Sequence, residues 1–166
     1  DHKTDDAPMN MPPVRIVVSS PQLKSIELSG SGDIDIKDSV ALGDLSLLLS
    51  GSGDIDIEYL DCSSVKAVVS GSGDIKIDHV ECEGDAVCDL TGSGDINVDV
   101  VSDNVNVTVS GSGDADLTVD CDVINAKAIG TGNMKLVGTA KVLNKHSSGL
   151  ASIDTKKLEV EQINLK

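Results

Sequence analysis

The sequence predicts an all-β protein, a single-domain, right-handed parallel β-helix or solenoid with coils of about 20 residues. Three observations predict this fold. A short block, G-[ST]-G-[DN], recurs along the chain at nearly constant spacing. Apolar and polar residues alternate on both sides of each block. Large aromatic side chains are almost absent, with one Tyr and no Phe or Trp among 166 residues. A core without large aromatic side chains must be filled by small aliphatic ones, which suits a narrow interior.

The repeat sets the architecture. Its block begins at six glycines: Gly30, Gly51, Gly71, Gly92, Gly111 and, as GTGNM, Gly130. Successive blocks lie 21, 20, 21, 19 and 19 residues apart, and a weaker copy, SSGLASI, follows at 147–153. A period near 20 with small variation is typical of stacked coils whose loops differ by one residue. Parallel crossovers are overwhelmingly right-handed, which predicts the hand of the coil.

Each repeat alternates in a way that predicts strands. In the second repeat Leu45, Leu47, Leu49, Ile55 and Ile57 share one parity with the glycines. Side chains of that parity point to one face of a strand. A strand of about 15 residues exceeds the usual length, so we expect the glycines to form a corner with positive φ. The coil is then strand, corner, strand and a short polar loop such as KDS (37–39) or DCSS (61–64). The predicted corner glycines are Gly30, Gly32, Gly51, Gly53, Gly71, Gly73, Gly92, Gly94, Gly111, Gly113, Gly130 and Gly132.

The ends of the chain depart from the repeat. Residues 1–13 hold three prolines and many polar residues, which predicts a flexible lead-in. VRIVVSS (14–20) and LKSIELS (23–29) are expected to be the first strands, and the β-helix is expected to span 14–153. Residues 154–166 are expected to cap the last coil, or to form a basic end that meets the acidic body of another copy. A helix is not expected except near this C-terminus.

The charge distribution excludes some partners. The formal net charge is −15, divided into −19 over residues 1–126 and +4 over residues 127–166. An acidic body lacks the basic surface that nucleic acids and anionic lipids require. No apolar run reaches the length that spans a bilayer, so direct membrane insertion is not expected. The chain begins with Asp, so we expect a processed form from which any signal peptide or lipid anchor has been removed.

The corner aspartates are the residues with the strongest chemical interest. Stacking should place the first Asp of each block in one column, which comprises Asp33, Asp54, Asp74, Asp95 and Asp114 and ends at Asn133. Carboxylates one coil apart repel one another, so they must accept hydrogen bonds from corner amides, take up protons or bind a weak calcium ion. A second column mixes signs: Asp35, Asp56, Lys76, Asn97, Asp116 and Lys135. A phosphate cradle is not expected, because the glycines lead into a strand and an Asp follows them.

Neither a catalytic constellation nor a cofactor site is expected. The block serines form a hydroxyl column, and none of His2, His79 and His146 shares a block with them. Cys62 and Cys82 each lie 11 residues after their block's first glycine, so they should stack and could form a disulfide. Cys88 and Cys121 share the apolar parity and are expected to be buried. The Cys and His spacing does not suit a metal site.

The SGSGDI blocks, the opening VRIVVSSPQLKSIELSGSGDI and the closing AKAIGTGNMKLVGTAKVLNKHSSGLASI resemble the head GIN domain family of bacterial proteins. Members are described as auto-transporter adhesins of Bacteroidetes, and the resemblance covers about residues 14–153. It implies an exported β-helix shaped like the pectin lyases but without their catalytic residues, with cell adhesion as its role. The sequence departs from the family where a longer segment usually precedes the first repeats, and at Ser148–Ala151, where another GSG block is expected.

Three classes of function remain open. The first is a non-catalytic adhesin or display module at the cell surface, the outer membrane or the periplasm, binding an unknown glycan or host protein. The second is a carbohydrate-active β-helix, although the acids here belong to the repeat and aromatic platforms for sugars are missing. The third is a structural protein that assembles end to end as a homo-oligomer.

Overall fold

The structure is a computed structural model that describes residues 23–37 and 40–165. Strands account for most of this part, and no helix occurs in it. The strands are β1 (Ser25–Leu28), β2 (Ile34–Ile36), β3 (Val40–Leu49), β4 (Ile55–Ile57), β5 (Leu60–Val69), β6 (Ile75–Cys82), β7 (Asp85–Leu90), β8 (Ile96–Val109), β9 (Ala115–Gly130), β10 (Asn133–Gly149) and β11 (Ser152–Leu165).

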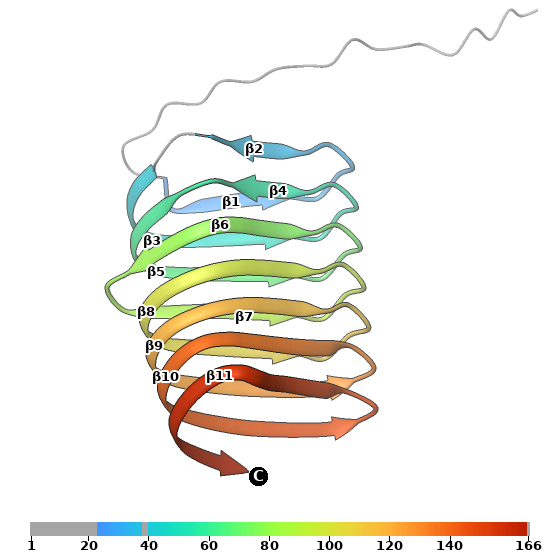
Figure 1. Cartoon of the computed structure of the whole chain (residues 1–166). Helices are drawn as coiled ribbons and strands as arrows, with labels where there is room; N and C mark the ends of the chain where they lie inside the picture. Colours follow the sequence, from blue (N-terminus) through green and yellow to red (C-terminus); the bar gives the residue numbers. More distant parts are fainter. Residues whose placement is uncertain (1–22, 38–39, 166) are drawn as a thin grey trace, which may run out of the picture.

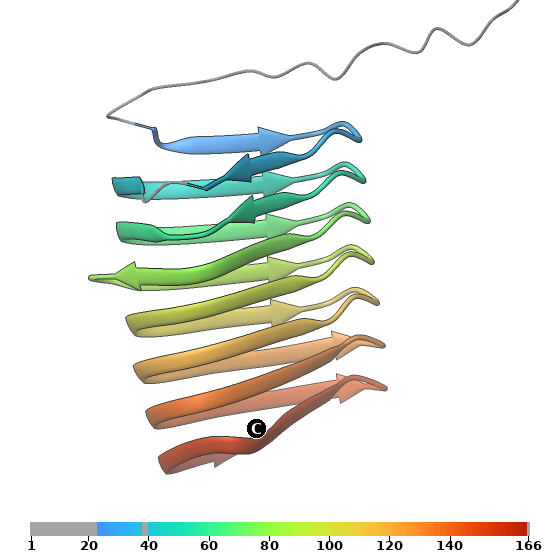
Figure 2. The ribbon, with the colours of Figure 1, turned by 45° about the horizontal axis from the view of Figure 1, so that its top comes forward.

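The chain is a parallel β-solenoid with one repeat per turn. Every strand pairing is parallel and joins residues about one repeat apart, such as Ile55 with Ile75 and Ile96 with Ala115. The near strands in Figure 1, which include β4 and β6, run from right to left, and the far strands run back while the chain descends. The coil is therefore right-handed, as predicted. Figure 2 shows the flattened turns stacked into a rod, with a corner at one edge and a smoother bend at the other.

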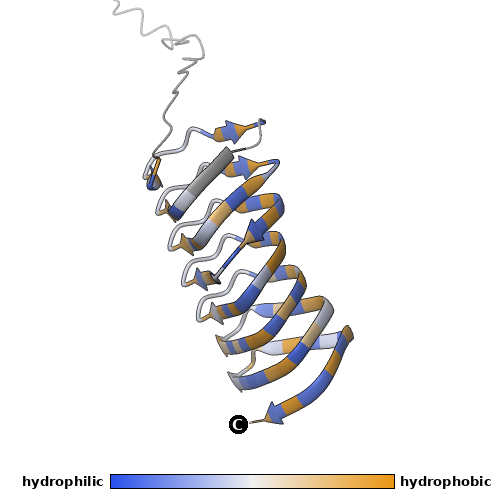
Figure 3. Cartoon of the chain, turned by 90° about the vertical axis from the view of Figure 1, so that its left-hand side faces the viewer, coloured by the Kyte–Doolittle hydropathy of each residue, from blue (hydrophilic) through white to orange (hydrophobic). Residues whose placement is uncertain are grey.

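The strands belong to one 11-stranded sheet that is folded into two facing layers. Hydrophobic and hydrophilic residues alternate along its strands (Figure 3). Inward side chains stack on their equivalents in neighbouring turns and form the core, and each layer turns its polar residues outward. One inward column contains Ile34, Ile55, Ile75, Ile96, Ala115, Met134 and Ile153. From Ile55 to Met134 its members are at most 1% exposed. The core is thus a stack of small aliphatic layers, which explains how the protein folds without large aromatic side chains.

The glycine blocks form the corners, for a reason that differs partly from the prediction. Positive φ was expected at all twelve corner glycines, and this was wrong for eleven of them, because among these only Gly130 has a φ in the left-handed region, at 118°. The constraint is steric. A Cβ on Gly71 would lie 1.9 Å from the carbonyl oxygen of Gly51, and one on Gly73 would lie 2.0 Å from that of Gly53. The corners stack too closely to accommodate a Cβ atom on these glycines.

At the opposite edge, the DCSS segment does not form the polar loop that the sequence predicted. DCSS (61–64) lies inside β5, and β8 to β10 run continuously through the bend as strands of 14 to 17 residues. The chain bends around one position per turn that is left out of the strand register, which includes Ser63 in β5 and Asp122 in β9. Asp38 and Ser39, in the other expected loop, lie outside the described residues.

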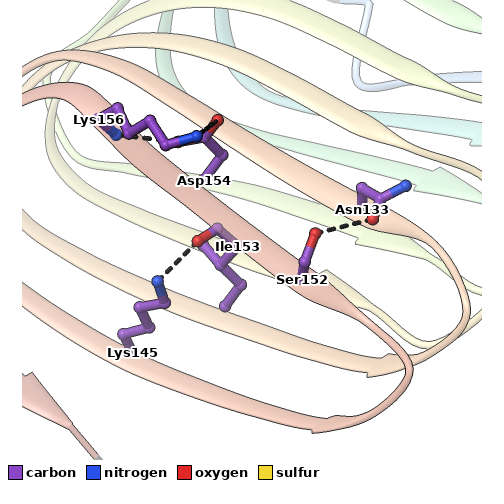
Figure 4. A network of polar contacts seen from close by, with 6 residues as sticks. All are labelled: Asn133, Lys145, Ser152, Ile153, Asp154 and Lys156. Carbon is purple, nitrogen blue, oxygen red and sulfur yellow. Dashed lines mark hydrogen bonds and ion pairs between the residues drawn. The ribbon is translucent and has the colours of Figure 1, made fainter.

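The two ends of the stack differ. LKSIELS contains β1, as predicted, whereas VRIVVSS and the expected lead-in of 1–13 lie outside the described residues. At the other end the weak copy SSGLASI holds the seventh corner, where Gly149 pairs with Gly130. Residues 154–165 belong to β11, which lies parallel to β10 across the last turn (Figure 1). The Nζ of Lys145, at an inward position, donates to the carbonyl oxygen of Ile153 at 2.6 Å and closes this end of the core (Figure 4).

Candidate functional site

The corner aspartates stack into the predicted column. The Oδ1 of Asp33 accepts a hydrogen bond from the backbone N–H of Asp54 at 3.1 Å, and the same bond repeats up the stack. Asp54 accepts from Asp74 at 2.9 Å, Asp74 from Asp95 at 2.8 Å, Asp95 from Asp114 at 2.7 Å, and Asp114 from Asn133 at 2.6 Å. Each carboxylate therefore caps the amide of the next corner. Asn133 continues the ladder by accepting from the Ser152 hydroxyl at 2.8 Å (Figure 4).

Hydrogen bonding to corner amides was one of the three expected outcomes for the stacked carboxylates. One oxygen of each carboxylate accepts such a bond from the next corner. Within 23–37 and 40–165, no three His, Cys, Asp or Glu side chains converge closely enough to hold a metal ion. The second carboxylate oxygens face solvent, since these aspartates are exposed. A weak calcium ion along the column stays a prediction that a titration must decide.

The layer of the sheet that follows the corners carries most of the charge, and we call it the acidic face. Its first outward column contains Asp35, Asp56, Lys76, Asn97, Asp116 and Lys135 in the predicted order, and Asp154, which was not predicted, continues it. A second contains Asp61, Glu81, Val101, Asp120, Thr139 and Glu159. Lysines offset part of the charge: Lys76 lies 2.6 Å from Asp78 and Lys135 lies 3.6 Å from Asp116. The hydrogen bond to Asp78 raises the pKa of Lys76.

The layer of the sheet that precedes the corners carries fewer acids, which are Glu27, Asp44, Asp85 and Asp89, and we call it the neutral face. One outward column contains Ser25, Ser46, Lys66, Val87, Asn106, Asn125, Asn144 and Asn164. The adjacent column contains Glu27, Leu48, Val68, Asp89, Thr108, Lys127 and His146. The two faces of one rod therefore offer different chemistry, although the same repeat builds both.

An asparagine ladder crosses the C-terminal half of the neutral face. The side-chain N–H of Asn125 donates to Asn106 Oδ1, that of Asn144 donates to Asn125, and that of Asn164 donates to Asn144, each at 2.8 Å. Each linked amide is thereby fixed in orientation. Sequence reasoning missed this ladder because it followed the glycine block alone. The signal was available, since these asparagines recur at intervals of 19, 19 and 20 residues.

A shallow depression of about 250 Å³ lies on the ladder. Its lining includes Asn106, Thr108, Asn125, Lys127 and His146, together with the backbone between them. A smaller depression of about 130 Å³ lies on the acidic face between Asn97, Asp116 and Lys135. Both are open hollows at the surface.

The contacts of His79 do not include a serine of the glycine blocks. The hydroxyl column is visible where Thr131 Oγ1 donates to Ser112 Oγ at 3.1 Å. His79 stacks on Tyr59 with ring centroids 5.4 Å apart and lies near the carboxylates of Glu81 and Asp99, at 3.5 and 4.0 Å. His2 lies outside the described residues. The groups that surround His79 make a partly exposed polar cluster on the acidic face.

The cysteines lie inside the solenoid, at two places. Cys62 and Cys82 are register partners with their Sγ atoms 2.9 Å apart, and all four cysteines are free thiols. The hydrogen bond to Cys62 and burial raise the pKa of Cys82. Burial raises the pKa of Cys88 to about 12 and that of Cys121 to about 11. Both are buried, as predicted. The sequence did not predict that Cys121 also lies at the bend, where it pairs with Ser102.

A comparison with protein-family models identifies the family of the chain. The model of the family described as "putative auto-transporter adhesin, head GIN domain" matches residues 3–99 and again residues 86–166. The chain belongs to this family. The two matches overlap over 86–99, as expected when repeats of one kind fill both. No curated protein and no solved structure matches the chain. No helix among the described residues has the length and apolar character needed to cross a membrane.

Proposed function

We propose that this chain is a non-catalytic binding module of an exported adhesin, displayed at the cell surface or held at the outer membrane or in the periplasm. The observation that supports this most is membership of the adhesin head family over residues 3–166. The fold agrees with such a role, since a rigid rod presents long regular faces to a partner.

The neutral face is the surface on which we propose that the ligand binds. Its asparagine amides recur at the coil spacing of about 4.8 Å and are held in place by the ladder bonds. After those bonds, each linked amide retains a second N–H and a free lone pair. Groups fixed in advance bind at a lower entropic cost than mobile ones. Each contact is weak, and repetition along the rod adds avidity.

A neutral glycan is the ligand class that this face fits best. Amides and the hydroxyl of Thr108 exchange hydrogen bonds with sugar hydroxyls, and the face carries few charges to desolvate. The acidic face would repel acidic polymers, including uronates and sialylated chains. A host protein that carries such glycans, or that docks through its own backbone, is the competing ligand.

A binding array tests the proposal. Purified chain is applied to an array of glycans and extracellular-matrix proteins, once with millimolar calcium and once with EDTA. We expect binding to neutral glycans in both conditions. Binding that requires calcium would move the site to the aspartate column. Failure to bind any class would remove the proposal.

The same preparation tests the enzymatic alternative. The corner aspartates Asp33 to Asp114 repeat the same contact from turn to turn, whereas a catalytic pair needs two carboxylates in unlike environments. We therefore expect no turnover of pectic or uronate polymers. Release of unsaturated or reducing ends above the level of an inactivated control would replace adhesion with catalysis.

End-to-end association is a second candidate, favoured by the last turn. Leu150, Ile163 and Leu165 are 83%, 55% and 75% exposed there, on the basic end of the chain. A second copy could add its acidic first turn to the open edge of β11. Light scattering after size exclusion, at several concentrations and salt levels, separates the cases. Monomers throughout would exclude association, and oligomers lost in the Ile163→Glu variant would support it.

A further inference from the structure

The strongest unassigned feature lies at the bend between the second and third turns. Cys62, in β5, and Cys82, the last residue of β6, face each other across neighbouring strands. Their Sγ atoms are 2.9 Å apart, which is already inside the contact distance of two sulfur atoms. They are 2% and 8% exposed, so no solvent layer separates them. Register partners on adjacent strands have a Cα separation in the range that a disulfide requires.

We propose that Cys62 and Cys82 form a disulfide that staples the second turn of the solenoid to the third. The oxidant is a protein or small-molecule disulfide of the exported compartment. The Cys62 thiolate attacks one oxidant sulfur and releases the other as a thiolate, which leaves a mixed disulfide. The Cys82 thiolate then attacks Cys62 Sγ and releases the second thiol. Two protons and two electrons leave the protein, and the oxidant is reduced to two thiols. Because both sulfurs are buried, this exchange occurs before the turns close.

The position of the pair indicates that the disulfide would limit the opening of the N-terminal turns. The strands of the N-terminal turns, β1 to β5, have 3 to 10 residues, whereas β8 to β11 have 14 to 17. Solenoids open from their ends one turn at a time, because each turn contacts only its neighbours. Opening from the N-terminal end reaches Cys62 before the long strands. A covalent link at that point stops the opening ahead of the regular body.

The bend at this turn is also the place where the strand is interrupted. β6 ends at Cys82 and β7 begins at Asp85, whereas β8, β9 and β10 pass through the bend unbroken. Figure 2 shows the end of β6 projecting beyond the neighbouring turns. Cys121 occupies the same side of the bend in a later, unbroken turn, where its register partners are Ser102 and Ala140. The paired cysteines therefore lie beside the interruption, whereas Cys121, in an unbroken strand, has no cysteine as a register partner.

Thiol counting tests the bond directly. The chain is refolded with oxidised glutathione, denatured and titrated for free thiols. We expect two thiols per chain, against four after reduction. The Cys88→Ala/Cys121→Ala variant should still lose both remaining thiols on oxidation. The Cys82→Ala variant should keep all three. Four thiols in the oxidised wild type, or a bond that peptide mapping assigns to Cys88 or Cys121, would overturn the proposal.

Hydrogen exchange tests the effect of the staple. Oxidised and reduced wild type are compared at low denaturant, where turns open without global unfolding. Closing a loop of this length should lower the opening equilibrium of residues 63–81 on the order of a hundredfold. The amides of β9 to β11 should exchange equally in the two states. Equal exchange of residues 63–81 in the two states would show that the bond does not arrest opening.

Discussion

Replacing Gly71 by Ala tests the packing of the corners. The φ of Gly71 does not lie in the left-handed region, so alanine suffers no backbone strain there. Its methyl group would lie 1.9 Å from the carbonyl oxygen of Gly51, whereas real Cβ atoms stay beyond 3.0 Å. The two turns must therefore separate locally by about 1.1 Å, the difference between these distances.

The cost follows from the bonds that this shift breaks. The Gly51 carbonyl accepts the N–H of Ser72 at 3.0 Å and that of Gly73 at 3.3 Å. An added 1.1 Å takes both beyond hydrogen-bonding distance. Each lost bond costs about 1 kcal/mol, and about 1–3 kcal/mol where a buried group is left unpaired. We expect Gly71→Ala to lower the free energy of unfolding by about 2–5 kcal/mol, a large share of the stability of a domain.

Gly30 provides the matched control, because it opens the first block and its added Cβ would meet nothing within 4 Å. Urea unfolding followed by circular dichroism should place Gly30→Ala within about 0.5 kcal/mol of wild type. Equal destabilisation by both variants would refute the steric argument. So would a Gly71→Ala protein as stable as wild type.

Three further predictions concern the ladders, the thiols and the end of the core. Asp74→Ala should lower the free energy of unfolding by about 1 kcal/mol, because it leaves the Asp95 amide without its acceptor. Asp74→Asn should lower it little, since Asn133 already occupies an equivalent position in the same column. Thermal melts of the two variants test this. Burial raises the pKa of Cys88 to about 12, above the value of about 8.5 for a free thiol, so the unfolded chain loses that proton first. This stabilisation is complete below about pH 8.5 and is lost as the pH rises toward 12. The free energy of unfolding should therefore fall less over that window in Cys88→Ala than in wild type. Equal pH dependence of the unfolding free energy in the two proteins would contradict this prediction. Lys145→Met removes the hydrogen bond to the Ile153 carbonyl. The amides of β11 should then exchange faster with solvent hydrogen, while those of β8 should exchange as in wild type. An equal change in the exchange rates of β8 and β11 would refute the role of Lys145 in closing the core.

The repeat and its parity were sufficient to predict the solenoid. A glycine block every 20 residues and alternation on both sides of it determine the strands, the inward face and the stacking of Asp33 to Asn133. The register of Cys62 with Cys82 also followed from the repeat, because both lie at one distance from the block. These features depend on spacing alone, which the sequence contains.

What escaped prediction depends on contacts between turns. The conformation of the corner glycines could not be read from glycine content, since close stacking and positive φ both favour glycine. DCSS reads as a polar loop, yet parallel pairing with the neighbouring turns keeps Asp61 and Ser64 in a strand. The asparagine ladder belongs to a column that lacks the glycine block as a marker. The contrast between the faces appears only when the columns are assembled in space.

One binding comparison tests the central claim, that the neutral face binds the ligand. The glycan that the array selects is titrated against wild type and two matched amide-to-acid variants. Asn125→Asp adds charge on the neutral face and removes the donor to Asn106, and Asn97→Asp adds the same charge on the acidic face. Loss of a hydrogen bond from Asn125 should weaken binding about tenfold. Asn97→Asp should bind as wild type does. Unchanged binding by Asn125→Asp, or a larger loss in Asn97→Asp, would contradict the assignment of the neutral face.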